Sequence, residues 1–197
     1  VYMPVHYPSD FSLDKASSRY YSYYQLWLSK WRLRRQNILA GKGVIVEDKV
    51  EFRLTDNALI EIGDHTVISS YAYFLMTKPK PVLQIGKQVG IGRHCQLLVK
   101  GLVEIGDYTR IGSFVSIRDQ IHQSFKHSDE KVIDTHSDIS PVKIGRNVWI
   151  GNYCTIFPGG TIGDNAVIST YSLVMRDVPE GVVVAGQPAR AVNKRSK

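Results

Sequence analysis

The sequence predicts an all-β protein, a parallel β-helix built from hexapeptide repeats. Between positions 141 and 175, an aliphatic residue stands at every sixth position, and a small or β-branched residue stands two positions before most of them. A period of six fits neither an α-helix, with 3.6 residues per turn, nor a single strand, with a period of two. Three hexads make an 18-residue coil of three short strands, and stacked coils of this kind form a parallel β-helix. The aliphatic set is Ile144, Ile150, Ile156, Ile162, Ile168 and Val174, and the small set is Val148, Cys154, Gly160, Ala166 and Ser172.

The same register continues backwards through three earlier coils. Corresponding positions of successive coils lie 23, 20, 39 and 18 residues apart, so the chain carries extra segments of 5, 2, 21 and 0 residues. Insertions in a solenoid form loops at its corners, and a long insertion is often functional. We therefore expect the functional loop in the 21-residue excess, which is followed by Ile144. The earlier coils carry Ile62, Ile68 and Phe74, then Ile85, Ile91 and Leu97, then Ile105, Ile111 and Ile117.

Residues 1–42 differ in kind from the repeat. From position 17 onwards, aromatic residues recur at spacings of 4, 3 and 4, which gives a helix with one aromatic face surrounded by cations. We predict that this segment caps the open end of the β-helix, whose first strand would otherwise be an exposed edge. The alternative is a helix that lies on a membrane surface, which aromatic residues and arginines also suit. The aromatic face is Tyr20, Tyr24, Trp27 and Trp31, and the cations are Arg19, Lys30, Arg32, Arg34 and Arg35.

Residues 43–197 are predicted to form the β-helix domain, with an inserted loop at 118–143 and a C-terminal tail at 177–197. Positions 43–60 alternate and are rich in β-branched residues, so they read as strands. Their hexad register is blurred, and we expect Val44, Val50 and Leu54 to face inward. The five extra residues around Pro79 and Pro81 form a corner loop, where proline does not disturb a strand ladder.

Charge and hydropathy narrow the classes of partner. The net charge of +7 over 197 residues indicates an acidic partner, such as a phosphorylated cofactor, an anionic glycan or a membrane surface. Nucleic acid is not expected, because no recognition motif is present and the basic residues are spread out except near the two ends. No apolar run reaches the roughly 18 residues of a membrane span, and no signal peptide precedes the repeat. We expect a cytoplasmic protein, at the inner face of the membrane if the N-terminal segment binds lipid.

The two cysteines are predicted to be reduced packing residues. Cys95 and Cys154 both occupy the small interior position, on the third side of the coil but two coils apart. Because neighbouring strands lie about 4.8 Å apart, the two residues are separated by about 9.6 Å, too far for a disulfide. Reduced cysteines are typical of a cytosolic protein.

The long insertion contains three of the six histidines among polar residues: His122, His127 and His136. A polar loop of this length in a regular solenoid has no packing reason to exist. From the residues alone, His122 is either a general base, since a neutral imidazole accepts a proton near pH 7, or a surface histidine. The spacing of His122 and His127 is only a weak indication of metal binding, and we predict no metal site.

The repeat and its motifs resemble the hexapeptide-repeat acyltransferases, most closely the maltose and galactoside O-acetyltransferases and the bacterial polysaccharide O-acetyltransferases. The resemblance covers roughly positions 54–193. Its most specific parts are V-W-I-G at 148–151, P-G-G-T-I-G at 158–163 and V-V-A-G-Q-P-A-R at 183–190. It implies a left-handed β-helix, contrary to the usual right-handed crossover. It also implies a homotrimer with acetyl-CoA bound in a groove between neighbouring β-helices.

The resemblance also assigns roles to residues. The catalytic histidine of the family follows the last aliphatic residue before the long loop by five positions, which matches His122. By the same matching, Trp149 lies under the acyl site, and the backbone amide of Asn152 would stabilise the oxyanion of the tetrahedral intermediate. Cationic side chains suit the phosphates of CoA. The implied lining of the CoA arm is Gly151, Thr170, Arg176 and Arg190, and Lys194 and Arg195 are expected to contact the phosphates on charge alone.

Two positions depart from the family pattern. Maltose and galactoside enzymes place an acceptor-binding asparagine where this chain has Gly92, so a different mode of acceptor binding is expected. A small residue of the family is replaced by the bulky Tyr171, near the expected cofactor groove.

The sequence therefore predicts an acetyl-CoA-dependent O-acetyltransferase acting on a sugar or surface glycan. His122 would deprotonate the acceptor hydroxyl, which attacks the thioester within a ternary complex. The alternative is an N-acyltransferase acting on a nucleotide-linked amino sugar, in which a free amine would depend less on His122. Two more distant alternatives remain. A γ-type carbonic anhydrase would need three zinc-binding histidines on adjacent coils. A non-catalytic scaffold would not require a histidine in a long loop.

Overall fold

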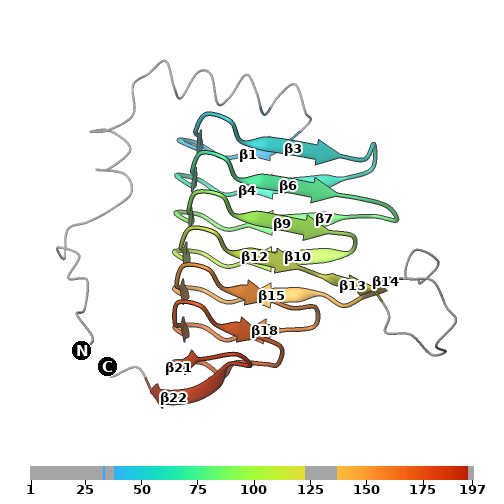
Figure 1. Cartoon of the computed structure of the whole chain (residues 1–197). Coiled ribbons are helices and arrows are strands. Elements are labelled where there is room, and N and C mark those ends of the chain that lie inside the picture. The colour runs from blue at the N-terminus through green and yellow to red at the C-terminus, as the bar shows by residue number, and fades with distance from the viewer. Residues whose placement is uncertain (1–32, 34–37, 123–136, 195–197) are drawn as a thin grey trace, which may run out of the picture.

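The computed structural model describes residues 33, 38–122 and 137–194. Its strands stack into a parallel β-helix with three faces, seen from the side in Figure 1. Each coil contributes one strand to each of three sheets, which confirms the predicted all-β solenoid. No helix within the described ranges is long and apolar enough to cross a membrane. The predicted N-terminal cap helix lies outside the described residues, except for Leu33, which is buried in the core.

Three sheets form the faces of the solenoid. The first sheet consists of β1 (Leu39–Ala40), β4 (Leu59–Ile62), β7 (Val82–Ile85), β10 (Leu102–Ile105), β15 (Val142–Ile144) and β18 (Thr161–Ile162). The second consists of β2 (Ile45–Val46), β5 (Val67–Ile68), β8 (Gly90–Ile91), β11 (Arg110–Ile111), β16 (Trp149–Ile150), β19 (Val167–Ile168), β21 (Val182–Ala185) and β22 (Arg190–Lys194). The third consists of β3 (Glu51–Leu54), β6 (Tyr73–Met76), β9 (Gln96–Val99), β12 (Ser116–Arg118), β17 (Thr155–Ile156) and β20 (Leu173–Val174).

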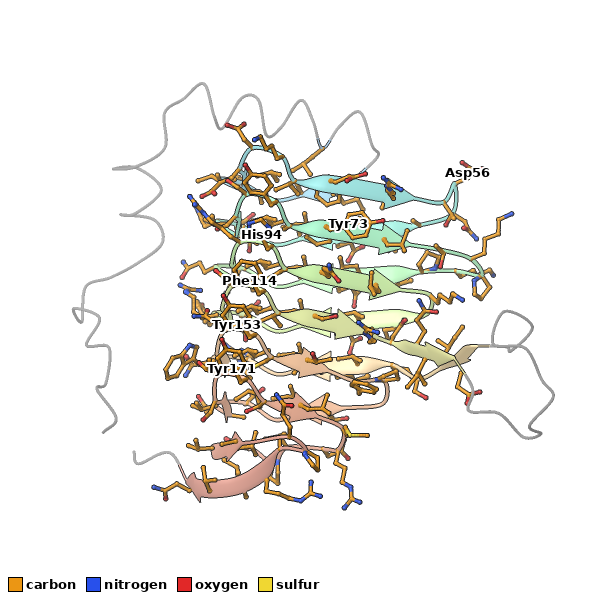
Figure 2. The ribbon with its side chains drawn as sticks, in the orientation of Figure 1. Asp56, Tyr73, His94, Phe114, Tyr153 and Tyr171 are labelled. Carbon is orange, nitrogen blue, oxygen red and sulfur yellow. The ribbon has the colours of Figure 1, made fainter. Side chains whose placement is uncertain are left out.

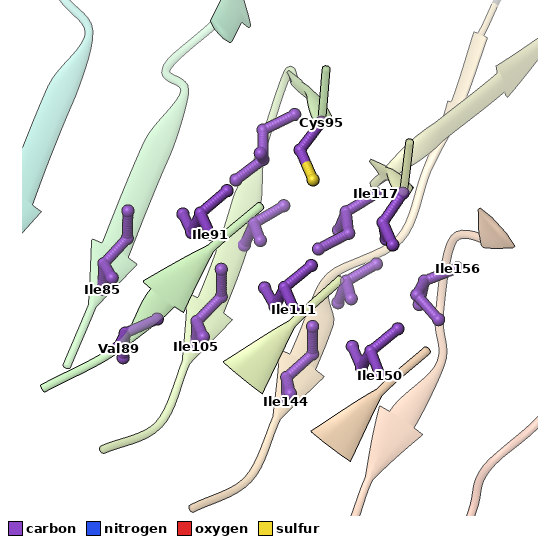
Figure 3. Close-up of a cluster of buried hydrophobic side chains, with 14 of the residues drawn as sticks. Ile85, Val89, Ile91, Cys95, Ile105, Ile111, Ile117, Ile144, Ile150 and Ile156 are labelled. Carbon is purple, nitrogen blue, oxygen red and sulfur yellow. The ribbon is translucent and has the colours of Figure 1, made fainter. Parts of the chain in front are cut away.

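The predicted hexad positions form the core. Figure 3 shows the aliphatic side chains of successive coils pointing into one narrow interior. Every aliphatic residue of the predicted set is at most 4% exposed, and the small residues two positions earlier are buried as well. Burial of these side chains is the main favourable contribution to folding, at about 25 cal/mol per Å² of apolar surface. Cys95 and Cys154 are buried and unpaired, as predicted.

The first coil keeps its predicted inward-facing residues. Val44 is buried, and Val50 and Leu54 are half-buried and pack against the core. Phe52, also half-buried against the core, pairs with Phe74 of the next coil. Their rings stack with centroids 4.6 Å apart, so the wide end of the core accommodates two large rings. The hexad pattern is hard to recognise in this coil because Phe52, an aromatic residue, takes a position that is aliphatic in most later coils.

The three corners of the solenoid differ in regularity. The first corner joins the first sheet to the second, the second corner joins the second sheet to the third, and the third corner leads back to the first sheet. All three predicted insertions lie at the third corner, in the loops 77–81, 100–101 and 119–141. The longest insertion begins and ends as an antiparallel hairpin of β13 (Gln120–His122) and β14 (Ser137–Ile139), which projects from the solenoid in Figure 1.

The second corner carries a row of stacked rings that the sequence analysis did not identify. Adjacent ring centroids are 4.8 Å apart and their planes lie within 12° of parallel. The rings form one column in Figure 2. The spacing equals the separation of neighbouring strands, so each ring lies on the ring of the coil before it. We call this set the aromatic ladder: Tyr71, His94, Phe114, Tyr153 and Tyr171.

The ladder explains why a bulky residue stands at position 171. Tyr171 stacks on Tyr153 as the last ring of the row. All ladder residues have a positive φ, for example 59° at Phe114, a conformation that favours glycine or asparagine. Stacking of the rings offsets the cost of this backbone conformation.

We expect Phe114→Asn to lower the free energy of unfolding by about 1–3 kcal/mol, because it removes two stacked pairs at about 0.5–1.5 kcal/mol each. Asparagine tolerates the positive φ, so the change tests stacking rather than backbone strain. The matched control, Tyr171→Asn, removes one pair and should cost about half as much. Urea titration of the three proteins measures both values, and equal losses would show that stacking does not stabilise this corner.

Candidate active site

Two backbone amides at the second corner are available to a ligand. Asn152 and Thr170 follow β16 and β19 at equivalent places in consecutive coils, and both residues are exposed. Neither backbone N–H makes a hydrogen bond to any residue in the described ranges. One coil earlier, the equivalent amide of Ser113 donates to Asn152 Oδ1 at 2.8 Å. The second corner therefore offers two preorganised donors, which suit a carbonyl oxygen or an oxyanion.

Gly151 allows the close approach of these two coils. A Cβ atom at Gly151 would lie 2.6 Å from the backbone nitrogen of Thr170 and 2.7 Å from its Oγ1. Its own N–H donates to the carbonyl oxygen of Ile168 at 2.7 Å. Any larger residue at this position would push the Asn152 and Thr170 amides apart.

Trp149 supplies an exposed apolar side chain in the strand that leads to this corner. It is the first residue of β16, between Arg110 and Val167 in the neighbouring strands. Its side chain is 42% exposed, and that of Val167 is buried. The side chain of Arg110 is directed away from it, since the guanidinium donates to the carbonyl oxygen of Gln88 at the first corner.

The C-terminal tail brings a cation to the same corner. Leu173 donates its backbone N–H to Gly186 at 3.0 Å, and Ala189 donates to Leu173 at 2.8 Å. The Gln187 side-chain amide donates to the carbonyl oxygen of Tyr171 at 2.8 Å. Arg190, exposed at the start of β22, therefore lies near the end of the aromatic ladder. Gln187 was not predicted as a site residue.

Two of the predicted cofactor residues lie elsewhere. Arg176 follows β20 and is exposed at the third corner, at the opposite end of that strand from Tyr171. The backbone of Lys194 pairs with Val182, four residues along β22 from Arg190, or about 13 Å. The structure thus places Arg190 at the same corner as Thr170, with β21 between β22 and β19, whereas Arg176 and the backbone of Lys194 lie farther away.

The predicted base, His122, lies in β13 of the hairpin, opposite Ser137. The hairpin continues β12 away from the second corner, so it projects on the side of the solenoid opposite the labelled column of rings in Figure 2. Eight residues separate Phe114 from His122, about 26 Å of extended chain. Within one chain, therefore, His122 and the Asn152 amide stand at opposite ends of the third sheet.

Gly92 has no room for a side chain. A Cβ atom there would lie 2.5 Å from the carbonyl carbon of Gly112. An acceptor-binding asparagine at this position would require the two coils to separate. Metal ligation finds no support in the described ranges, where no three His, Cys, Asp or Glu residues lie close enough to hold an ion.

The cysteines are poor nucleophiles. Burial raises the pKa of the Cys95 thiol to about 11, and it raises the pKa of Cys154 as well. The thiols donate to the carbonyl oxygens of Gly112 at 3.0 Å and Ser169 at 3.1 Å. A thiolate, the reactive form, is therefore disfavoured at neutral pH. This agrees with acyl transfer without a covalent cysteine intermediate.

Comparison with known proteins identifies the fold. No family model matches the chain. The chain has 19% sequence identity to AntD, an N-acyltransferase from Bacillus cereus solved with dTDP and 3-hydroxybutyryl-CoA, with a TM-score of 0.72 over 85% of this chain and 88% of AntD. A maltose O-acetyltransferase from Clostridium difficile 630 is 26% identical, with a TM-score of 0.57 over 94% of this chain and 85% of that one. The solenoid therefore has the left-handed β-helix fold of acyltransferases.

The sequence relatives are also named acetyltransferases or acyltransferases. The chain is 41% identical over 98 residues to WbbJ, a putative lipopolysaccharide biosynthesis O-acetyl transferase of Escherichia coli K12, covering 47% of this chain and 50% of the relative. It is 37% identical over 123 residues to the galactoside O-acetyltransferase of Escherichia coli K12, covering 59% of each. A dTDP-4-amino-4,6-dideoxy-D-glucose acyltransferase of Escherichia coli is 29% identical over 161 residues, covering 80% of this chain and 82% of the relative. The chain spans about half the length of the first two relatives. Its repeat, solenoid and relatives resemble those of hexapeptide-repeat acetyltransferases.

We expect both thiols to resist alkylation at pH 8 in the native protein and to react once the protein is unfolded in urea. The pKa of Cys95 is raised from 9.0 to about 11, so the protonated thiol favours the folded state below pH 9. This contribution to stability is lost as the pH rises from about 9 to about 11, because the unfolded chain releases the proton first. Urea titrations across this range measure the effect, and Cys95→Ala should show a weaker pH dependence. Rapid labelling of the native protein would contradict the assignment.

Proposed function

We propose that the protein is an acetyl-CoA-dependent O-acetyltransferase that transfers acetyl to a hydroxyl of a sugar or surface glycan. The observation that carries the proposal is the pair of unused backbone amides at Asn152 and Thr170, with the exposed ring of Trp149 in the strand that leads to the same corner. Such a corner suits the carbonyl of a thioester and the extended arm that follows it. The O-acetyltransferases among the relatives support a hydroxyl acceptor.

The reaction is proposed to proceed by direct transfer. His122 takes the proton from the acceptor hydroxyl as its oxygen attacks the thioester carbonyl carbon. The Asn152 N–H donates to the resulting oxyanion. The carbon–sulfur bond then breaks, and His122 returns the proton to the departing CoA sulfur. Gly151, Thr170, Arg176 and Arg190 would hold the CoA arm, as the resemblance implies, while Lys194 remains a proposed phosphate contact on charge alone.

The separation of His122 from Asn152 supports a site shared between copies of the chain. One chain holds its base and its oxyanion donor at opposite ends of the third sheet. A neighbouring copy that presents its hairpin to the second corner would complete the site. We therefore propose a homotrimer, the assembly that the resemblance implies. Acetyl-CoA is a cytoplasmic metabolite, so we place the enzyme in the cytoplasm.

A second candidate is N-acylation of a nucleotide-linked amino sugar. It is favoured by the dTDP-4-amino-4,6-dideoxy-D-glucose acyltransferase, which aligns with 80% of this chain and thus over a longer stretch than the two O-acetyltransferases. A free amine is already nucleophilic, so this reaction would depend less on a general base.

A panel of acceptors separates the two functions. We expect release of CoA from acetyl-CoA with maltose, galactosides or surface oligosaccharides, and none above background with a dTDP-4-amino sugar. The acetylated product should be an ester, which alkaline hydroxylamine cleaves, whereas an amide survives. A hydroxylamine-resistant product formed on the amino sugar alone would replace this proposal with N-acyl transfer.

We expect His122→Ala to lower kcat by roughly 10²–10⁴-fold while KM for acetyl-CoA stays within a few-fold, because a general base acts in the chemical step. His127→Ala is the matched control, since it removes a histidine from the same insertion and should leave kcat unchanged. Steady-state kinetics with the best acceptor measure both. Near-normal turnover in His122→Ala would remove this residue from the mechanism.

A further inference from the structure

Asp119 lies at the root of the hairpin that carries His122. Its side chain is fully buried, at 0% exposure. One carboxylate oxygen accepts the backbone N–H of Lys100 at 2.9 Å, and the other accepts that of Gly101 at 2.7 Å. These are the two consecutive amides of the third-corner loop one coil earlier. Both oxygens of the carboxylate are thus used to bind one loop of the solenoid.

The backbone of Asp119 joins the two ends of the insertion. Its carbonyl oxygen accepts the N–H of Ser140 at 2.9 Å, where the chain returns from β14. Its own N–H donates to Leu98 in the preceding coil at 3.3 Å. Ser140 in turn accepts from Gly159 in the following coil at 3.2 Å. Asp119 therefore ties both strands of the hairpin to the solenoid at one point.

The hairpin lies directly on the Lys100–Gly101 loop. A Cβ atom at Gly101 would lie 2.8 Å from Cγ2 of Ile139 in β14 and 3.4 Å from Oδ2 of Asp119. Farther along the hairpin, Ile121 and Asp138 are exposed. The root is thus closely packed, while the strands beyond it project from the solenoid.

Asp119 differs from the other carboxylates that cap corners of the solenoid. Those residues each accept a single backbone amide, and none of them is buried. Asp119 accepts two amides and is inaccessible to water. Two half-buried backbone donors would lose their acceptors without it, which is costly. The single-amide caps are Asp64, Asp107, Asp164 and Asp177, through Oδ1, and Glu47, through Oε2.

We propose that Asp119 is a positioning residue for His122: its buried carboxylate sets the direction in which β13 leaves the solenoid and thereby the place at which the imidazole meets the acceptor. The inference rests on the proposed role of His122 as general base. His122 follows Asp119 by three residues, all in or next to one short strand. A change of angle at the root is therefore carried to the histidine along this strand.

The first test is Asp119→Asn, which keeps the shape but places an NH₂ group against a backbone N–H. We expect kcat to fall roughly 10- to 100-fold, as for a displacement of a reacting group by about 1 Å, with KM for acetyl-CoA within about twofold. Asp107→Asn is the matched control, because Asp107 also accepts a backbone amide, that of Lys87, at the first corner of the same coil. It should leave kcat unchanged.

A double-mutant cycle shows whether Asp119 acts through His122. If it does, Asp119→Asn should have no further effect on kcat in a His122→Ala background. The inference would be overturned if the fold-loss in kcat of the double mutant equalled the product of the two single-mutant losses, or if Asp119→Asn left kcat unchanged. Either result would leave the proposed function intact. Near-normal turnover of His122→Ala would refute the proposed base, and this inference with it.

A second variant keeps the inference testable if Asp119→Asn does not fold. Gly101→Ala pushes a methyl group against Ile139, while its distance of 3.4 Å from the Asp119 carboxylate is an ordinary contact, and it should lower kcat in the same way. Ile139→Ala removes the clashing Cγ2 and should restore kcat in the Gly101→Ala background. Unchanged kcat in Gly101→Ala, or failure of Ile139→Ala to restore it, would overturn the inference.

Discussion

The separation of about 4.8 Å between stacked coils is the constraint on which this structure depends. It is the distance at which parallel strands form hydrogen bonds, and it places every residue directly over its counterpart in the next coil. The corners have the least room. At Gly92 and Gly151, a single added carbon would lie 2.5–2.6 Å from the backbone of the next coil. The same spacing lets five rings stack at 4.8 Å along the second corner.

The candidate site appears where this regular pattern of corner contacts stops. At most capped corners, a carboxylate or amide side chain accepts the free N–H of a neighbouring coil, as Asp107 does for Lys87. Asn152 still caps Ser113, but its own N–H and that of Thr170 are left without an acceptor among the described residues. A buried donor without a partner would be costly, but an exposed one is available for a substrate at little cost. The second corner thus combines a rigid backbone with unused donors, which is what stabilising an oxyanion requires.

The third corner differs from the second because it carries the insertions. There the chain departs from the repeat in three loops, and the longest departure carries the predicted base. A projecting hairpin would place a histidine poorly unless its root were fixed. The buried Asp119 carboxylate, with one amide on each oxygen, provides such an anchor. The two corners lie at opposite ends of the third sheet, which is the reason for proposing an acyl-transfer site shared between two copies of the chain.

The sequence by itself determined the inward-facing residues, the positions of the insertions and the motif around Trp149. These follow from local rules: a period of six must describe a three-sided coil, and apolar side chains of that period must share one interior. The aromatic ladder was also accessible, because a ring follows the second aliphatic residue of five coils by three positions, as Tyr71 follows Ile68. Nothing in the sequence, however, distinguished Asp119 from the other acidic residues. Its role depends on the loop 100–101 lying one coil away, and only the stacked structure brings the two together. The tertiary structure likewise decided that Arg190 lies at the same corner as Thr170 while Arg176 lies at another, because the corner that a residue occupies depends on how the coils close.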